Sequence, residues 1–139
     1  MEPAGPVAQG DEWKPDMNRY AKTMGKWYRM ELDIEKSTVG TRYKGPVSIA
    51  GLKCDAVISS YDLKFTKLAD AAGGWTLKSA TMTSDSTSAM AHDIKVAALV
   101  SEKSTRDTEY RYEAKSEGRD YEAVSKSHEL LQRTMKPVK

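Results

Sequence analysis

The sequence predicts an α+β fold, in which an antiparallel sheet of five to six strands is flanked by an N-terminal and a C-terminal helix. Two observations predict it. Apolar residues recur at helical spacing near both ends of the chain, and between those ends they alternate with polar residues, as in half-buried strands. A small β-barrel followed by a C-terminal helix is an alternative arrangement of the same elements.

The first helix is expected between Trp13 and Trp27. Pro15 suits its first turn, where a missing N–H costs nothing. Residues 1–12 are expected to form a flexible lead-in, and residues 13–139 a single domain. The apolar stripe of this helix has spacings of four, three, four and three, and consists of Trp13, Met17, Tyr20, Met24 and Trp27.

Strands are expected where apolar and polar residues alternate. Residues 37–46 and 84–88 are expected to be loops, and 89–103 fits either a helix or a strand. A turn at Asp70–Gly74 should join two antiparallel strands. The expected strands are 28–34, 61–66, 75–83 and 108–114, with a short apolar stretch at 47–54.

The second helix is expected from Asp120 to Met135, with Pro137 ending it. Its residues allow favourable pairs four positions apart, Glu122 with Lys126 and Glu129 with Arg133. The apolar stripe of this helix consists of Tyr121, Val124, His128, Leu131 and Met135.

Composition narrows the class of protein. The 139 residues carry 22 Lys and Arg against 20 Asp and Glu, a net charge of +2, which argues against broad wrapping of nucleic acid. The lone cysteine, Cys54, excludes an intrachain disulfide. No apolar run approaches the length of a bilayer span, and the first ten residues do not resemble an intact secretory signal. We expect a soluble protein, either cytoplasmic or exported with its signal removed.

The first helix also carries a basic face. Arg19, Lys22, Lys26 and Arg29 are spaced three, four and three apart. Such a face suits a protein partner, self-association, an anionic membrane surface or another acidic partner. The simpler interpretation is a solvated face on a helix that packs by its aromatic side.

The segment Asp16–Tyr20, followed by Gly25-Lys26-Trp27, resembles the start of a lipocalin barrel, where a short helical turn leads into a Gly-x-Trp motif. The later hairpin and the C-terminal helix fit the same order loosely. The resemblance implies that Gly25 and Trp27 lie at the closed end of a calyx. It also implies a carrier of a small hydrophobic ligand.

No catalytic signature is present. Cys54 with His92 or His128 would supply a nucleophile and a base, but its apolar neighbours favour a buried thiol, and no cluster of residues has metal-ligand spacing. Phosphate-binding loops and nucleophile elbows are absent as well. We therefore expect a non-catalytic binding or interaction protein that needs no cofactor and no metal.

Tyr110 and Tyr112, with Arg106 and Arg119 nearby, suggest a stacking platform for single-stranded nucleic acid. Acidic residues are interleaved in the same stretch and would repel phosphates. The tyrosines are therefore more simply the buried face of a strand, and nucleic acid is an unlikely partner.

Overall fold

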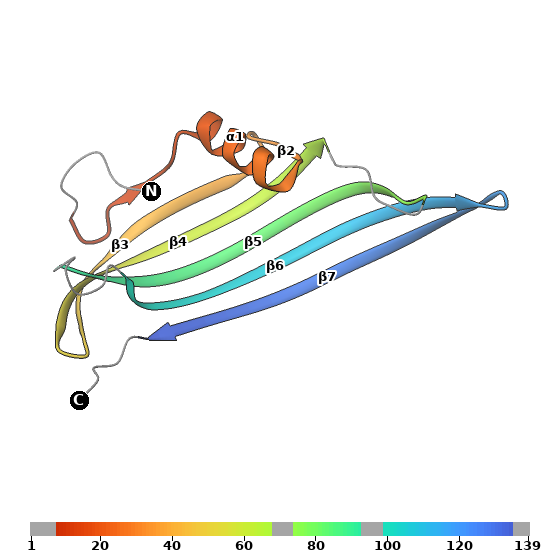
Figure 1. Cartoon of the computed structure of the whole chain (residues 1–139). Coiled ribbons are helices and arrows are strands. Elements are labelled where there is room, and N and C mark those ends of the chain that lie inside the picture. The colour runs from red at the N-terminus through yellow and green to blue at the C-terminus, as the bar shows by residue number, and fades with distance from the viewer. Residues whose placement is uncertain (1–7, 68–73, 93–98, 135–139) are drawn as a thin grey trace.

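The computed structural model describes residues 8–67, 74–92 and 99–134, which form one antiparallel sheet of seven strands and one helix. The strands follow the order β1-β3-β4-β5-β6-β7, and β2 pairs with β4 beside the end of β3 (Figure 1). The elements are β1 (Glu12–Trp13), α1 (Met17–Tyr28), β2 (Glu31–Leu32), β3 (Thr38–Ile49), β4 (Leu52–Lys67), β5 (Thr76–Ala91), β6 (Leu99–Ser116) and β7 (Arg119–Thr134).

Two tight turns make the long hairpins. Ala50 and Gly51, with φ of 52° and 79°, join β3 to β4, and Glu117 and Gly118, with φ of 52° and 74°, join β6 to β7. Positive φ at both central residues is the geometry of the two-residue turn that matches the twist of antiparallel strands. Each turn therefore fixes the register of the hairpin that it closes.

Local signals at both ends define α1. The Asp16 carboxylate accepts hydrogen bonds from the backbone N–H groups of Asn18 and Arg19, at 3.0 and 3.3 Å, and so caps the first turn. Arg29 ends the helix in a left-handed conformation. Gly25 suits its place in the helix because a Cβ there would make a tight contact, 3.2 Å, with the carbonyl oxygen of Met30, where the chain doubles back.

The helix packs on one side of the sheet, which we call the helix face. Leu63, 1% exposed, lies at the centre of the core there and packs with Phe65 and Met82. Met17, Tyr20 and other apolar residues of α1 cover this cluster. Burial of this surface is the main stabilising contribution that the described residues reveal.

A smaller cluster lies on the opposite side, which we call the far face, beside the β3–β4 turn. It contains Cys54, Ala89 and Val100. The side chains of β7 are exposed apart from that of Ala123, which is half-buried. The core is thus concentrated at two places on a long, thin sheet.

The predicted α+β fold with two flanking helices is wrong. Residues 120–134 belong to β7, and the C-terminal helix expected there is absent from the described residues. Glu122 and Glu129 bond Arg111 and Arg106 of β6, at 3.1 and 2.5 Å, instead of partners four positions along a helix. Because both faces of β7 are exposed to solvent, its sequence lacks the alternation of apolar and polar residues that identifies a half-buried strand.

Several smaller predictions are corrected as well. The helix expected from Trp13 begins at Met17, and Trp13 lies in β1. The expected loop at 37–46 belongs to β3 from Thr38 onward, and the expected loop at 84–88 lies within β5. The expected strand at 28–34 is reduced to Glu31–Leu32 because α1 continues to Tyr28. Residues 89–103 hold the end of β5 and the start of β6. The sheet does not close in the described part of the chain, so the alternative of a small barrel with a C-terminal helix is also wrong.

The strand predictions at 61–66 and 108–114 are confirmed within β4 and β6, and the prediction at 75–83 is confirmed in β5 from Thr76 onward. Phe65 of β4 faces Ala80 of β5, as an antiparallel pair requires. Most of the predicted Asp70–Gly74 turn, and Met135 and Pro137, lie outside the described residues. Of the expected lead-in, residues 8–12 are described, and the Gly10 N–H donates to the Tyr43 carbonyl oxygen at 2.8 Å.

Candidate functional site

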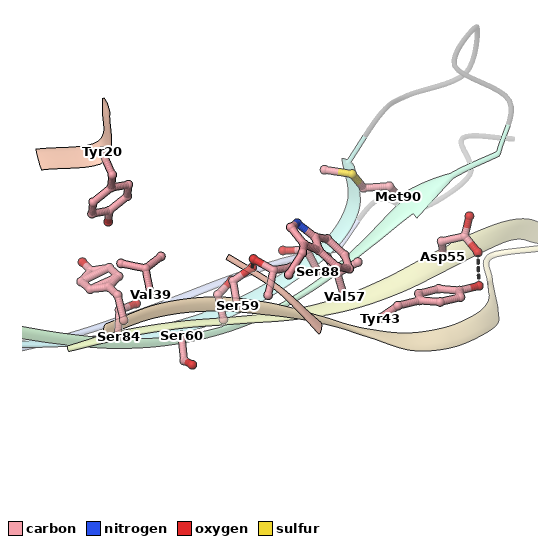
Figure 2. A pocket seen from close by; sticks show the side chains of 14 residues that line it. Tyr20, Val39, Tyr43, Asp55, Val57, Ser59, Ser60, Ser84, Ser88 and Met90 are labelled. Carbon is pink, nitrogen blue, oxygen red and sulfur yellow. Dashed lines mark hydrogen bonds between the residues drawn. The ribbon is translucent and has the colours of Figure 1, made fainter. Parts of the chain in front are cut away.

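A groove of about 540 Å³ lies on the helix face, over the middle of β3, β4 and β5 (Figure 2). Tyr20 points down into it from α1, whereas the side chain of Ser60 lies on the far side of the strands and only its backbone borders the space. The side chains on the helix face that line the groove are Trp13, Tyr20, Val39, Thr41, Tyr43, Asp55, Val57, Ser59, Tyr61, Ser84, Ser86, Ser88 and Met90.

Small hydroxylated side chains form the floor of the groove. Thr41, Ser59 and Ser86 stand side by side on adjacent strands, and the first two hydroxyls are 3.2 Å apart. Ser84 and Ser88 continue the floor along β5. Because serine fills so little volume, the face that is packed near Leu63 becomes hollow further along the same strands.

Tyrosines form the end of the groove nearest α1. Burial, assisted by Tyr61 and Tyr28, raises the pKa of Tyr20 to about 12. Burial is also the main reason that the pKa of Tyr61 is raised. Both phenols are therefore neutral at physiological pH, and this end of the groove is largely apolar with hydroxyl groups at its edge.

A charged cluster occupies the opposite end. The Tyr43 hydroxyl donates to Asp55 Oδ1 at 2.5 Å, and His92 Nε2 lies 2.9 Å from the other oxygen of the same carboxylate. The hydrogen bond from Tyr43, then that from His92, lowers the pKa of Asp55, and the same bond raises the pKa of Tyr43. Both carboxylate oxygens are thus engaged by neighbouring side chains.

Trp13 lies along the wall. Strand β1 holds it opposite Thr41, and its indole Nε1 is buried without a hydrogen-bond acceptor among the described residues. A buried donor without an acceptor costs about 1–3 kcal/mol. Trp13 is therefore the least satisfied polar group of the groove.

A second hollow of about 530 Å³ adjoins the groove and shares Tyr61 and Ser84 with it. It extends across β6 toward β7, where Arg106 and Glu129 form an ion pair at 2.5 Å. The two hollows thus meet at Tyr61 and Ser84, and the second ends at the ion pair of Arg106 and Glu129.

The structure separates the predicted basic residues from the groove. Arg19, Lys22 and Lys26 are exposed on the outer side of α1, and Arg29 is exposed where the helix ends. Trp27 is 69% exposed, so it does not share the buried stripe of Met17, Tyr20 and Met24; Ala21 and Tyr28 take its place against the core. Gly25 and Trp27 thus lie on a helix and not on a barrel strand.

Tyr110 and Tyr112 lie in β6 with ring centroids 6.3 Å apart. Tyr110 packs against the core beneath α1, and burial raises its pKa. This placement agrees with the simpler prediction of a strand face and leaves the Tyr110 ring only partly accessible.

The candidate nucleophile and bases are not brought together. Cys54 is buried on the far face, and His92 bonds Asp55. His128 lies in β7, with its Nδ1 2.6 Å from Asp107 of β6. Within residues 8–67, 74–92 and 99–134, no group of three or more His, Cys, Asp or Glu residues is arranged to hold a metal ion.

Sequence reasoning missed the floor of the groove. The signal was the alternation of Ser84, Ser86 and Ser88 with other small polar residues, a period of two without apolar residues. Such a run is typical of a loop when apolarity is the criterion for a strand.

Comparison with known proteins gave no match, whether with family models, curated proteins or solved structures. The resemblance to lipocalins is therefore not tested by relatives and stays a prediction. None of the described residues forms a helix with the length and apolar content that a bilayer crossing requires.

Proposed function

We propose that the protein is a non-catalytic binding protein that holds a small, largely apolar ligand in the groove of the helix face. The ligand has a flat apolar body and carries a hydrogen-bond acceptor. The observation that carries this proposal is the buried Trp13 Nε1, a donor at the wall of the groove without an acceptor among the described residues. Because less than 1 Å² of this nitrogen is accessible, an acceptor on the ligand pairs with it after a turn of the indole ring toward the groove.

The dimensions and chemistry of the groove support such a ligand. A volume of about 540 Å³ falls within the range of small-molecule sites. Tyrosine and tryptophan rings offer apolar surface with polar edges, and serine hydroxyls provide adaptable donors and acceptors. The lining thus favours contact with an apolar body and a few directional bonds over recognition of charge.

The ionisable groups of the groove support binding over catalysis. Asp55, held by Tyr43 and His92, has a lowered pKa, whereas a general base works best with a pKa near neutrality. The Thr41 hydroxyl contacts Ser59 and no titratable base. These contacts support a binding role for the groove.

Two fluorescent naphthalene probes test the role of Trp13. Prodan carries a carbonyl acceptor, and N-phenyl-1-naphthylamine does not. Trp13→Phe keeps most of the ring surface and removes the N–H, so we expect prodan to bind about tenfold more weakly and the second probe to be little affected. Trp27→Phe, which changes an exposed ring outside the groove, should leave both affinities unchanged.

A pair of leucine variants tests the place of binding. Ser86→Leu fills the floor and should abolish binding of both probes, whereas Thr87→Leu puts the same side chain on the far face of the same strand. Absence of saturable prodan binding, or equal effects of the two leucines, would refute the groove as the site.

A second candidate function rests on the exposure of Trp27 beside Lys26 and Lys22. An exposed indole at the edge of a basic helix surface suits docking on an anionic membrane. Vesicles of phosphatidylglycerol in phosphatidylcholine should bind the protein, and Lys22→Glu with Lys26→Glu should weaken binding at least tenfold. Equal binding of the charge variant, or binding to pure phosphatidylcholine, would exclude this surface and leave an acidic protein partner as the remaining use of it.

A further inference from the structure

Strand β7 has an open edge. It pairs with β6 along its whole length, from Arg119 to Thr134, and in the described part of the chain it pairs with no other strand (Figure 1). It bears exposed apolar side chains, among them Tyr121 at 48% and Val124 at 43%. A long edge with unpaired backbone N–H and carbonyl groups is a template for another strand, and proteins usually cover or blunt such an edge.

The charges of β7 are arranged antisymmetrically about Val124. Between residues 119 and 129, each residue that carries or can carry a charge has one of opposite sign at the same distance on the other side of Val124. From the centre outward the pairs are Glu122 with Lys126, Asp120 with His128, and Arg119 with Glu129.

This order is what an antiparallel self-pairing strand needs. When two copies of one edge pair symmetrically within a continuous sheet, the two-fold axis is perpendicular to the sheet and passes between two copies of one central residue. Residues equally distant from that centre then stand opposite each other and on the same face. With Val124 at the centre, Arg119, Glu122, Lys126 and Glu129 each meet an opposite charge, and Asp120 meets His128.

We propose that β7 pairs with β7 of a second copy of this chain, antiparallel and with Val124 opposite Val124. The two sheets then form one continuous sheet, joined by about ten backbone hydrogen bonds. Both helices and both grooves lie on the same side of it. This proposal is independent of the ligand proposed for the groove.

Ion pairs within each chain continue across this junction. Lys126 Nζ lies 3.9 Å from Glu109 of β6, and Glu122 lies 3.1 Å from Arg111. In the pair of copies, Glu109 and Lys126 of one copy would be followed by Glu122 of the other, which contacts Arg111 diagonally and has Glu113 directly opposite it on β6. Glu129, which bonds Arg106, would likewise stand between two arginines.

Neighbouring registers lose this complementarity. A centre at Ala123 or Ser125 places Val124 opposite Glu122 or Lys126, and a centre at Lys126 places Arg119 opposite Arg133. Like charges directly opposite each other destabilise a sheet. Charge thus selects one register, while the backbone supplies most of the affinity, because exposed ion pairs contribute little by themselves.

A mixture of two charge variants tests the proposed pairing of β7 with β7. Sedimentation of the wild-type chain should show a species of twice 15.5 kDa that dissociates on dilution. Lys126→Glu and Glu122→Lys should each weaken it about tenfold, because each sets like charges opposite at two places. A one-to-one mixture of the two variants should form the dimer again, since every contact across the edge is then complementary although each chain keeps its internal change.

The matched control is Lys64→Glu. The Lys64 side chain is also exposed and lies 3.9 Å from Asp62 of the same strand, but β5 and β6 separate it from the edge, so its reversal should leave dimerisation unchanged. A wild-type chain that stays monomeric, a dimer indifferent to Lys126→Glu, or a mixture no tighter than its components would overturn the proposal.

Cysteine substitutions test the register. Opposite residues in an antiparallel pair have Cα atoms about 4.5–5.5 Å apart, within the reach of a disulfide. Val124→Cys should therefore form a cross-linked dimer rapidly under mild oxidation. Leu130→Cys, on the same face and more exposed at 62%, should not, because its two copies would lie about 40 Å apart. Equal cross-linking by the two variants would overturn the register centred on Val124.

Discussion

Leu63 is the residue whose truncation should cost the fold most. It is 1% exposed and lies between the sheet and α1. Leu63→Ala removes three carbon atoms, worth about 2.4 kcal/mol by transfer, and leaves a cavity that the neighbouring Met30 and Met82 fill only in part. We expect the free energy of unfolding to fall by about 3 kcal/mol, a large part of the total for a domain of this size.

Urea denaturation followed by circular dichroism measures this loss. With a slope of about 2 kcal/mol per molar, the midpoint should fall by about 1.5 M. Leu130→Ala removes the same atoms from a side chain that is 62% exposed and should change the free energy by less than about 0.5 kcal/mol. A loss below about 1 kcal/mol for Leu63→Ala, or equal losses for the two variants, would refute a core centred between α1 and β4.

Three further predictions concern the cap of α1 and the titrating groups of the groove. Asp16→Ala should cost about 1 kcal/mol in urea denaturation, and Asp16→Asn, which can still accept hydrogen bonds from the helix N–H groups, much less. The raised pKa of Tyr20 means that the folded chain keeps a proton that the unfolded chain releases near pH 10. Stability should therefore decline as the pH rises from 10 toward 12, and Tyr20→Phe should reduce that decline in urea midpoints taken at pH 9 and 11. The lowered pKa of Asp55 makes a contribution that is present above its usual value of 3.8 and lost as the pH falls below it. The difference between wild type and Asp55→Asn should accordingly be below about 1 kcal/mol at pH 7, and an equal difference at pH 2 would contradict this assignment.

The half-buried strands were predictable because apolar residues mark the buried face and more polar residues mark the exposed face. In β4, Tyr61, Leu63 and Phe65 point toward α1 and the intervening residues are more polar, so the period of two is visible. The stripe of α1 was predictable in the same way, apart from Trp13, which lies in β1, and Trp27, which is exposed. An aromatic residue at the edge of a stripe faces the core or the solvent according to how the helix packs on its sheet. The sequence of the helix alone does not determine that packing.

The groove could not be predicted from apolar periodicity, because small polar side chains form its floor. Ser84, Ser86 and Ser88 look like a polar loop, yet β5 runs through them, held by β4 on one side and β6 on the other. Pairing with two neighbours determines the strand there, whatever its own propensity. The small side chains that conceal the strand are the same ones that leave room for a ligand.

The mistaken helix at 120–135 has a related cause, and it bears on the open edge. Glu122 and Lys126 stand four residues apart, a spacing that favours one face of a helix. In β7 the same residues instead lie two positions on either side of Val124, and symmetric pairing of two strands about that residue brings them together between chains. A helix and a self-pairing strand thus share this spacing, and charge pattern alone does not distinguish them. The structure does distinguish them, because Arg111 and Glu109 of β6 contact Glu122 and Lys126 within the sheet, and the outer edge of β7 beside these residues is the one that the proposed second copy would pair with.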